Sequence, residues 1–150
     1  MESWIALIIV VITFCCMEIV AWATHKYIMH GWLWYFHEDH HNHDSRLKPF
    51  ERNDFFFLLF ATPGILLINK GYNQLSLAFW IGLGITIYGF AYFLVHDLFI
   101  HQRIKIFRKI NHPYFEGIRR AHKIHHKKLT KEGGECFGML WVPLKYFNKK

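Results

Sequence analysis

The chain alternates between long apolar segments and polar segments. Residues 4–24 and 75–95 are each long enough to cross a bilayer as a helix, which requires about 20 apolar residues. Glu18 is the only charged residue in the first segment, and the second segment has none. The amino terminus lacks the positive residues of a secretory signal, so we expect the first segment to be retained as a span. The pattern predicts an all-α integral membrane protein, with residues 1–150 forming a single domain.

A third apolar segment, residues 55–69, is shorter and contains Pro63. As a helix it would be roughly 22 Å long, so it either crosses a thin bilayer or enters as a re-entrant segment, giving three or four membrane segments in all. The chain then turns at residues 69–73, where Gly and Asn favour a turn, and returns to the side that it left. The polar segments, residues 25–54 and 96–135, are therefore expected on the same side of the membrane.

Small side chains form a stripe along residues 75–95. They are Ala78, Gly82, Thr86 and Gly89. A stripe of this kind lets helices approach closely in lipid. Close packing is the interpretation that we favour, and a groove for a substrate is the alternative.

The net charge of +7 is unevenly distributed. Of the 18 Lys and Arg residues, four lie within residues 25–54 and 13 beyond residue 100, so 17 fall on one side of the predicted spans and Lys70 on the other. This distribution follows the positive-inside rule. We therefore predict a multi-pass protein of the inner (cytoplasmic) membrane, with the histidine segments facing the cytosol. Lipid headgroups, rather than nucleic acid, are the expected partners of the positive charges.

The two polar segments contain all 12 histidines and repeat one pattern. In each, an H-x4-H pair is followed by an H-x2-H-H triple. Random placement of the histidines would give roughly 0.08 such triples, so two are far outside chance. The ten patterned residues are His25, His30, His37, His40, His41, His96, His101, His122, His125 and His126.

The spacing of the triples suits metal binding. Positions i, i+3 and i+4 of a helix lie within one turn and on one face, so we expect the three imidazoles of a triple to converge. Residues five apart diverge by about 140° on a regular helix. Each H-x4-H pair therefore either straddles a helix end, which Gly31 after His30 would suit, or serves two metals. Neutral imidazole binds iron, zinc, copper and nickel, and ten histidines fit two ions better than one.

Crowded histidines beside a basic surface would repel one another if they were protonated, and metal coordination would hold them neutral. His43 and His112 lie outside the pattern, and we interpret them as surface or hydrogen-bonded residues.

Carboxylates near the motifs are candidates to support the histidines, because metal-bound imidazoles usually donate their second N–H to an oxygen. Asp97 adjoins His96, and Asp39 lies within the first triple, where a solvated position is equally consistent. A carboxylate near the inner end of a span is costly. We therefore hypothesise that Glu18, seven residues before His25, supports a ligand histidine.

Several longer stretches resemble one known family. They are Met17-Glu18, HKYIMHGWLW from His25, HEDHH from His37, FERND from Phe50, WIGLGITIYGFAYFLVHDLFIHQR from Trp80, AHKIHH from Ala121, KEGG from Lys131 and FGMLWVP from Phe137. Together they resemble the fatty acid hydroxylase and sterol desaturase superfamily of membrane di-iron oxygenases, and within it the bacterial β-carotene hydroxylases. The resemblance covers nearly the whole chain.

The resemblance implies O₂-dependent hydroxylation of the β-ionone rings of β-carotene at C3, giving cryptoxanthin and then zeaxanthin. It implies that the ten patterned histidines bind two iron ions, which zinc could replace during purification, and that a ferredoxin-type protein supplies electrons. A basic surface around Arg103, Lys105, Arg108 and Lys109 could dock such an acidic donor or hold lipid headgroups.

Other functions remain as alternatives. Within the superfamily these are a carotenoid ketolase and a lipid or sterol hydroxylase. A membrane metal-binding or transport protein is a different class, but a transporter places its ligands near the middle of its spans, and no histidine lies within the predicted spans. A histidine pH sensor would not require the duplicated spacing.

Overall fold

The computed structural model describes residues 2–42, 50–104, 107 and 110–148, and this part of the chain contains helices and no strand. In chain order the elements are α1 (Ser3–Ala23), η1 (Thr24–Trp32), α2 (Trp34–His41), α3 (Asp54–Gly71), η3 (Tyr72–Gln74), α4 (Leu77–Phe93), η4 (Leu94–Ile100), α5 (Pro113–His125) and η5 (Leu144–Tyr146). The segments η1 and η4 are π-helical, and η3 and η5 are short 3₁₀ turns. The predicted all-α class is confirmed.

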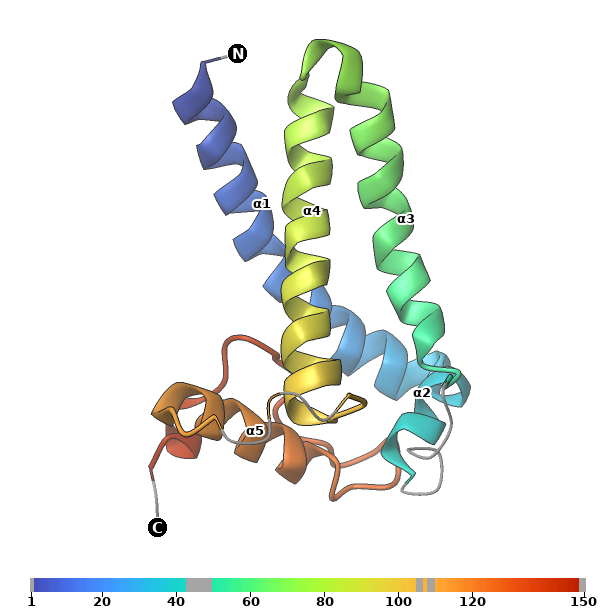
Figure 1. The fold of residues 1–150 in the computed structure, drawn as a ribbon. Coiled ribbons are helices and arrows are strands. Elements are labelled where there is room, and N and C mark those ends of the chain that lie inside the picture. Colours follow the sequence, from blue (N-terminus) through green and yellow to red (C-terminus); the bar gives the residue numbers. More distant parts are fainter. Residues whose placement is uncertain (1, 43–49, 105–106, 108–109, 149–150) are drawn as a thin grey trace.

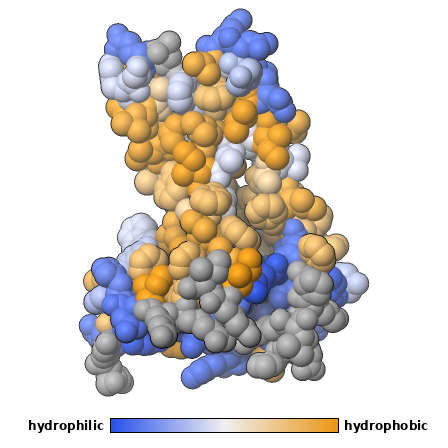
Figure 2. Space-filling view, viewed as in Figure 1, coloured by the Kyte–Doolittle hydropathy of each residue, from blue (hydrophilic) through white to orange (hydrophobic). Residues whose placement is uncertain are grey.

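Three continuous helical stretches are long and apolar enough to cross a membrane: Ser3–Trp32, Asp54–Gln74 and Leu77–Ile100. The second of these was the marginal segment. Its helix runs without a break through Pro63 and reaches 21 residues with the turn that follows, so its length suits a span rather than a re-entrant segment. Figure 2 shows hydrophobic side chains around the middle of the molecule and hydrophilic ones at both ends.

The amino terminus and the turn between α3 and α4 lie at one end of the molecule, and α2 and α5 lie at the other (Figure 1). The helix α4 stands between α1 and α3 and contacts both. The two polar segments therefore meet at the same end, as the return of the chain requires.

Glycines bring α4 close to both neighbouring helices. A Cβ atom at Gly82 would lie 2.7 Å from the carbonyl oxygen of Gly64 on α3, and one at Gly84 would lie 2.7 Å from Cβ of Thr13 on α1. The stripe of small residues thus serves close packing at Gly82. Gly89 makes no such close contact, because a Cβ there would meet no atom within 4 Å.

A small hydrophobic core fixes α5 beneath the spanning helices. Phe99 of η4 packs with Ile118 and Ala121 of α5 and with Met139 and Val142 of the carboxy-terminal segment. At the start of α5 the His112 ring accepts a hydrogen bond from the Tyr114 backbone N–H, and Pro113 occupies the first turn. The predicted role of His112 outside the metal pattern agrees with this position as a helix cap.

We expect Gly82→Ala to destabilise the protein by about 1–3 kcal/mol, as overpacking of a close contact does, because the added methyl group would meet backbone atoms of α3. Gly89→Ala is the matched control, since its methyl group enters open space. Thermal unfolding in detergent would compare the two variants. Equal unfolding temperatures would contradict the packing described for Gly82.

Candidate metal centre

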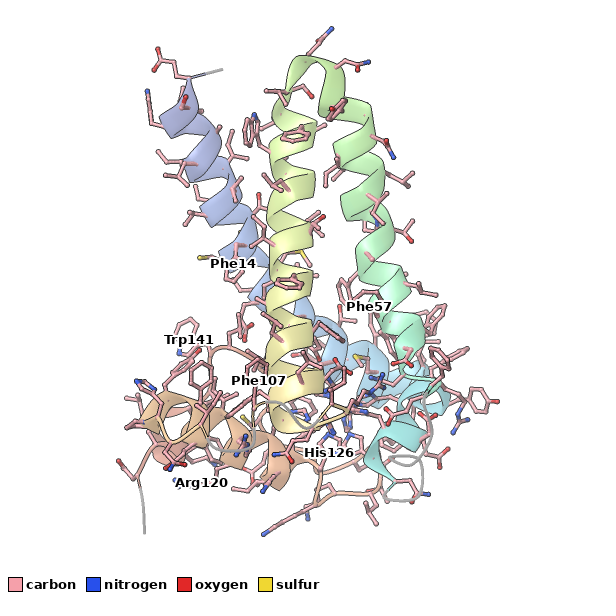
Figure 3. All side chains as sticks on the ribbon, viewed as in Figure 1. Phe14, Phe57, Phe107, Arg120, His126 and Trp141 are labelled. Atoms are coloured by element: carbon pink, nitrogen blue, oxygen red, sulfur yellow. The ribbon has the colours of Figure 1, made fainter. Side chains whose placement is uncertain are left out.

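The patterned histidines form two groups, and Figure 3 shows one member, His126, at the lower end of the spanning helices. Within each group one ring nitrogen of every member lies within 4.8 Å of the others. The first metal group consists of His25, His30, His37, His41 and His125, and the second of His40, His101, His122 and His126. His96 borders the second group, with its Nε2 3.0 Å from Nε2 of His40. All ten patterned histidines therefore meet in one place.

Each histidine triple contributes two members to one metal group and one member to the other. His37 and His41 join the first metal group, but His40 joins the second. On a helix, positions i and i+4 are about 40° apart, whereas i+3 and i+4 are about 100° apart. The second triple splits in the same way and sends His125 to the first metal group. The rings of the first triple do lie close together, with centroids 4.8–6.4 Å apart, but each triple divides between the two metal groups. Both groups therefore need residues from both halves of the chain.

The H-x4-H pairs lie on π-helical segments, with His101 directly after the second of them, and hydrogen bonds there close over five residues. The backbone N–H of His101 donates to the carbonyl of His96 over 2.9 Å. Residues five apart then share a face, and the rings of His25 and His30 lie 5.2 Å apart between centroids. The expected divergence of 140° does not apply. The break expected at Gly31 is present, because its φ of −112° and ψ of −121° are not helical.

Hydrogen bonds at Nδ1 orient seven of these rings. Each of the seven acceptors is an oxygen without a proton to donate, so Nδ1 carries the hydrogen and Nε2 has a free lone pair. The acceptors are the carbonyls of Phe137, Lys131, Lys128 and Glu135 for His25, His30, His41 and His125, and the side chains of Asn53, Glu51 and Asp97 for His37, His40 and His96. Every member of the first metal group is oriented in this way.

The Nε2 atoms face one another at short distances. Those of His25 and His37 are 3.1 Å apart, and those of His30 and His125 are 3.2 Å apart. Two lone pairs cannot form a hydrogen bond, so this arrangement suits a cation between them. Imidazole nitrogens bound to one divalent ion at about 2.0–2.1 Å lie about 2.9–3.4 Å apart for angles of about 90–110°. The donors present therefore fit a metal such as iron or zinc.

Burial by itself keeps these imidazoles uncharged. Removal from water lowers the pKa of His37 and His40 well below the usual value, and repulsion from neighbouring imidazoles adds to the effect. Burial, followed by the nearby His41 and His30, lowers the pKa of His125 to about 3. The sequence argument assigned neutrality to the metal, whereas burial supplies it first.

Arg103 joins two carboxylates that support the second metal group. Its guanidinium lies 3.2 Å from Glu51, which accepts from His40, and 3.1 Å from Asp97, which accepts from His96. Asp97 was predicted for this role. Glu51 and Asn53 were not, although both belong to the FERND stretch that carried the family resemblance.

Two other carboxylates hold the chain around the site. Glu18 accepts three backbone hydrogen bonds, at 2.9–3.0 Å, from residues 139–141 and one of 2.8 Å from the hydroxyl of Tyr88. The hypothesis that Glu18 supports a histidine is thus corrected, because Glu18 anchors the segment that follows Phe137. The carbonyl of Phe137 accepts a hydrogen bond from Nδ1 of His25. Asp39 accepts a hydrogen bond of 2.7 Å from the backbone N–H of Arg52 and so fixes the FERND stretch.

The predicted basic docking surface is altered. Arg103 forms ion pairs with Glu51, Asp54 and Asp97 and so belongs to the support of the metal groups. Lys105, Arg108 and Lys109 lie outside the described residues, as does His43.

The helices and histidine groups define a membrane protein with a candidate dinuclear metal centre. The sequence profile of the fatty acid hydroxylase family matches residues 10–145, and the chain belongs to that family. A β-carotene hydroxylase of Pantoea ananas is 45% identical over 141 residues, covering 93% of this chain and 78% of that protein. One of Pseudescherichia vulneris is 41% identical over 135 residues, covering 90% and 76%.

Plant relatives are longer. The chloroplastic β-carotene 3-hydroxylase of Gentiana lutea is 37% identical over 131 residues, which cover 85% of this chain and 40% of that protein. No solved structure matches the chain. The resemblance inferred from the motifs is confirmed.

We expect Arg103→Met to weaken metal binding in the second metal group by about 10- to 100-fold, as the loss of an outer support does, because Glu51 and Asp97 would lose their shared cation. Arg52→Met is the control, since its ion pairs are with Glu38 and Asp39. Metal content after dialysis against a chelator would fall from about two ions per chain towards about one in the first variant alone. Equal retention in both variants would contradict this role.

Acidification should destabilise the metal-free protein. A buried histidine with a lowered pKa stays neutral in the folded state, whereas the unfolded chain takes up protons below about pH 6.5. The free energy of unfolding is therefore highest above pH 6.5 and falls as the pH is lowered towards the folded pKa of about 3 for His125. Unfolding measured at about pH 7.5 and 5.5, above the usual range of carboxylate titration, should show this loss. A flat profile would contradict it.

Proposed function

We propose that this protein is a β-carotene 3-hydroxylase that uses two iron ions and O₂. The observation that carries the proposal is the pair of histidine groups at the end of three membrane-length helices, since in the first group Nδ1 hydrogen bonds leave the Nε2 lone pairs facing one another. The choice of substrate follows from the β-carotene hydroxylases that match most of the chain.

The reaction requires an oxidant, because C3 of a β-ionone ring is a methylene that acid–base chemistry cannot activate. Iron held by the two histidine groups would supply the redox chemistry that activates O₂ for this reaction. The protein binds the metal ions and positions the substrate beside them. Neutral imidazoles provide the ligands, and the oxygen acceptors at their Nδ1 atoms fix the direction of each Nε2.

Each part of the chain has a distinct task in this proposal. The triple on α2 and the triple at the end of α5, whose last member His126 caps that helix, would contribute ligands to both ions, and the H-x4-H pairs would complete the set. Glu51, Asn53 and Asp97 orient three of the rings. Glu18 keeps the segment after Phe137 in place.

The membrane delivers the substrate. A hydrocarbon dissolved in the bilayer reaches the metal groups along the spanning helices, whose outer surfaces expose large apolar side chains such as Leu7, Leu58 and Phe90. The positive-inside distribution of charge supports an inner membrane location with the metal groups on the cytosolic side.

Electrons would arrive from the opposite direction. A cavity of about 310 Å³ is lined by His101, His122 and His126 of the second metal group and by Lys123 and Lys127. Both lysines are exposed, so they provide a positive field for an acidic ferredoxin-type protein.

Expression in a host that accumulates β-carotene would test the function. We expect cryptoxanthin and zeaxanthin with the unaltered protein, together with about two iron ions per purified chain, one for each histidine group. His40→Ala and His125→Ala should abolish both products, because each removes a ligand from one metal group. His112→Ala is the matched control, since His112 is an exposed helix cap. Ketocarotenoids, or unchanged β-carotene with the unaltered protein, would contradict the proposal.

A further inference from the structure

A groove and a smaller cavity adjoin one another near the start of α3 and the end of α4. The groove, of about 550 Å³, is lined by Phe55 and Leu58 of α3 and Phe93 of α4, and also by charged residues that include Glu51, Asp97 and Arg103. The cavity, of about 70 Å³, is lined on its apolar side by Phe56, Phe60 and other residues of the spanning helices. Phe57 lines both, and Figure 3 shows it on the lower half of α3. Asp54 and Asp97 also line both spaces, so Phe57 is the aromatic part of the wall between them.

The cavity ends at the candidate metal centre. Its lining includes His96, which borders the second metal group, and Asn53, which orients His37 of the first. Met29, next to His30, lines it as well. The cavity therefore reaches both metal groups from the spanning helices, and it shares no lining residue with the polar cavity at Lys123 and Lys127.

Gly89 keeps the cavity open on the α4 side. It is one of the lining residues, and a Cβ atom there would meet nothing within 4 Å. The two tight glycines on the same helix, Gly82 and Gly84, face neighbouring helices instead. The absence of a side chain at Gly89 thus creates space beside the site rather than a helix contact.

The volumes decide what can enter. A cavity of about 150 Å³ accommodates benzene, so the cavity of about 70 Å³ is too small for a substituted six-membered ring unless a wall moves. Phe57 is the wall that can move most easily, because 56% of it is exposed. Its rotation would join the cavity to the groove of about 550 Å³. The combined space is large enough for a ring together with a stretch of extended chain.

We propose that this groove and cavity bind a long, rigid hydrocarbon by its cyclic end, with the ring beside Gly89 and His96, the chain in the groove, and Phe57 as the movable partition. This inference rests on the proposed function, whose substrate has that shape. It adds a binding site and two residues, Gly89 and Phe57, that set the size of the ring that is accepted.

Binding of β-carotene to the full-length protein in lipid nanodiscs would test the site without turnover. Without an electron donor the ligand is not consumed, and quenching of tryptophan fluorescence reports binding. We expect Gly89→Leu to weaken binding at least tenfold, because its side chain fills the space for the ring. Ile87→Phe is the matched control, since it adds bulk at a residue of the same helix that is 42% exposed, and it should bind as the unaltered protein does.

Two further variants guard against a fold defect in Gly89→Leu. Gly89→Ala should give an intermediate affinity at an unchanged unfolding temperature. Phe57→Trp, at a largely exposed position, should slow hydroxylation in cells without loss of iron. Equal binding by the unaltered protein, Gly89→Leu and Ile87→Phe would overturn the site. If the unaltered protein binds β-carotene but does not hydroxylate it, the proposed function fails while the binding site stands.

Discussion

The structure depends on one electrostatic constraint: buried imidazoles have their lone pairs pointed at one another. Oxygen acceptors fix the proton on Nδ1 in all five members of the first metal group. Protonation of Nε2 is opposed by burial, which lowers the pKa of His37 and His125. A divalent cation between the Nε2 atoms would stabilise their facing lone pairs. The Nε2 atoms have the spacing of ligands around one ion. The fold at this end of the molecule is therefore arranged around a site whose positive charge a metal cation would supply.

The exchange of His40 and His125 between the groups makes this constraint a global one. A cation in the first metal group would connect α2 with α5, and a cation in the second would connect the same two helices again. The spanning helices are joined through η1 and η4, whose π-helical turns place two histidines each at the site. Metal binding and assembly of the helices at this end are therefore coupled.

Much of the fold and of the histidine site could be predicted from the sequence, because these features follow from composition and from the short spacing of residues. The spans, the shared side of the polar segments and the ten histidines needed only apolar length and a repeated motif. The π-helical turns could not be predicted, because no residue type marks a change from four-residue to five-residue hydrogen bonding. The backbone hydrogen bonds of Glu18 come from residues more than 120 positions away, and the open space at Gly89 depends on side chains from several helices. The division of the triples was accessible in principle, since i+3 and i+4 point in different directions on any helix.

Mössbauer spectroscopy of the protein loaded with ⁵⁷Fe tests the central claim most directly, because it distinguishes the two iron environments. Single substitutions of the histidines by alanine should sort by metal group rather than by motif. His40→Ala should alter the same iron as His122→Ala, and His125→Ala the same iron as His37→Ala. If instead His40→Ala and His37→Ala alter one iron and His122→Ala and His125→Ala the other, the exchange between the two halves of the chain is wrong.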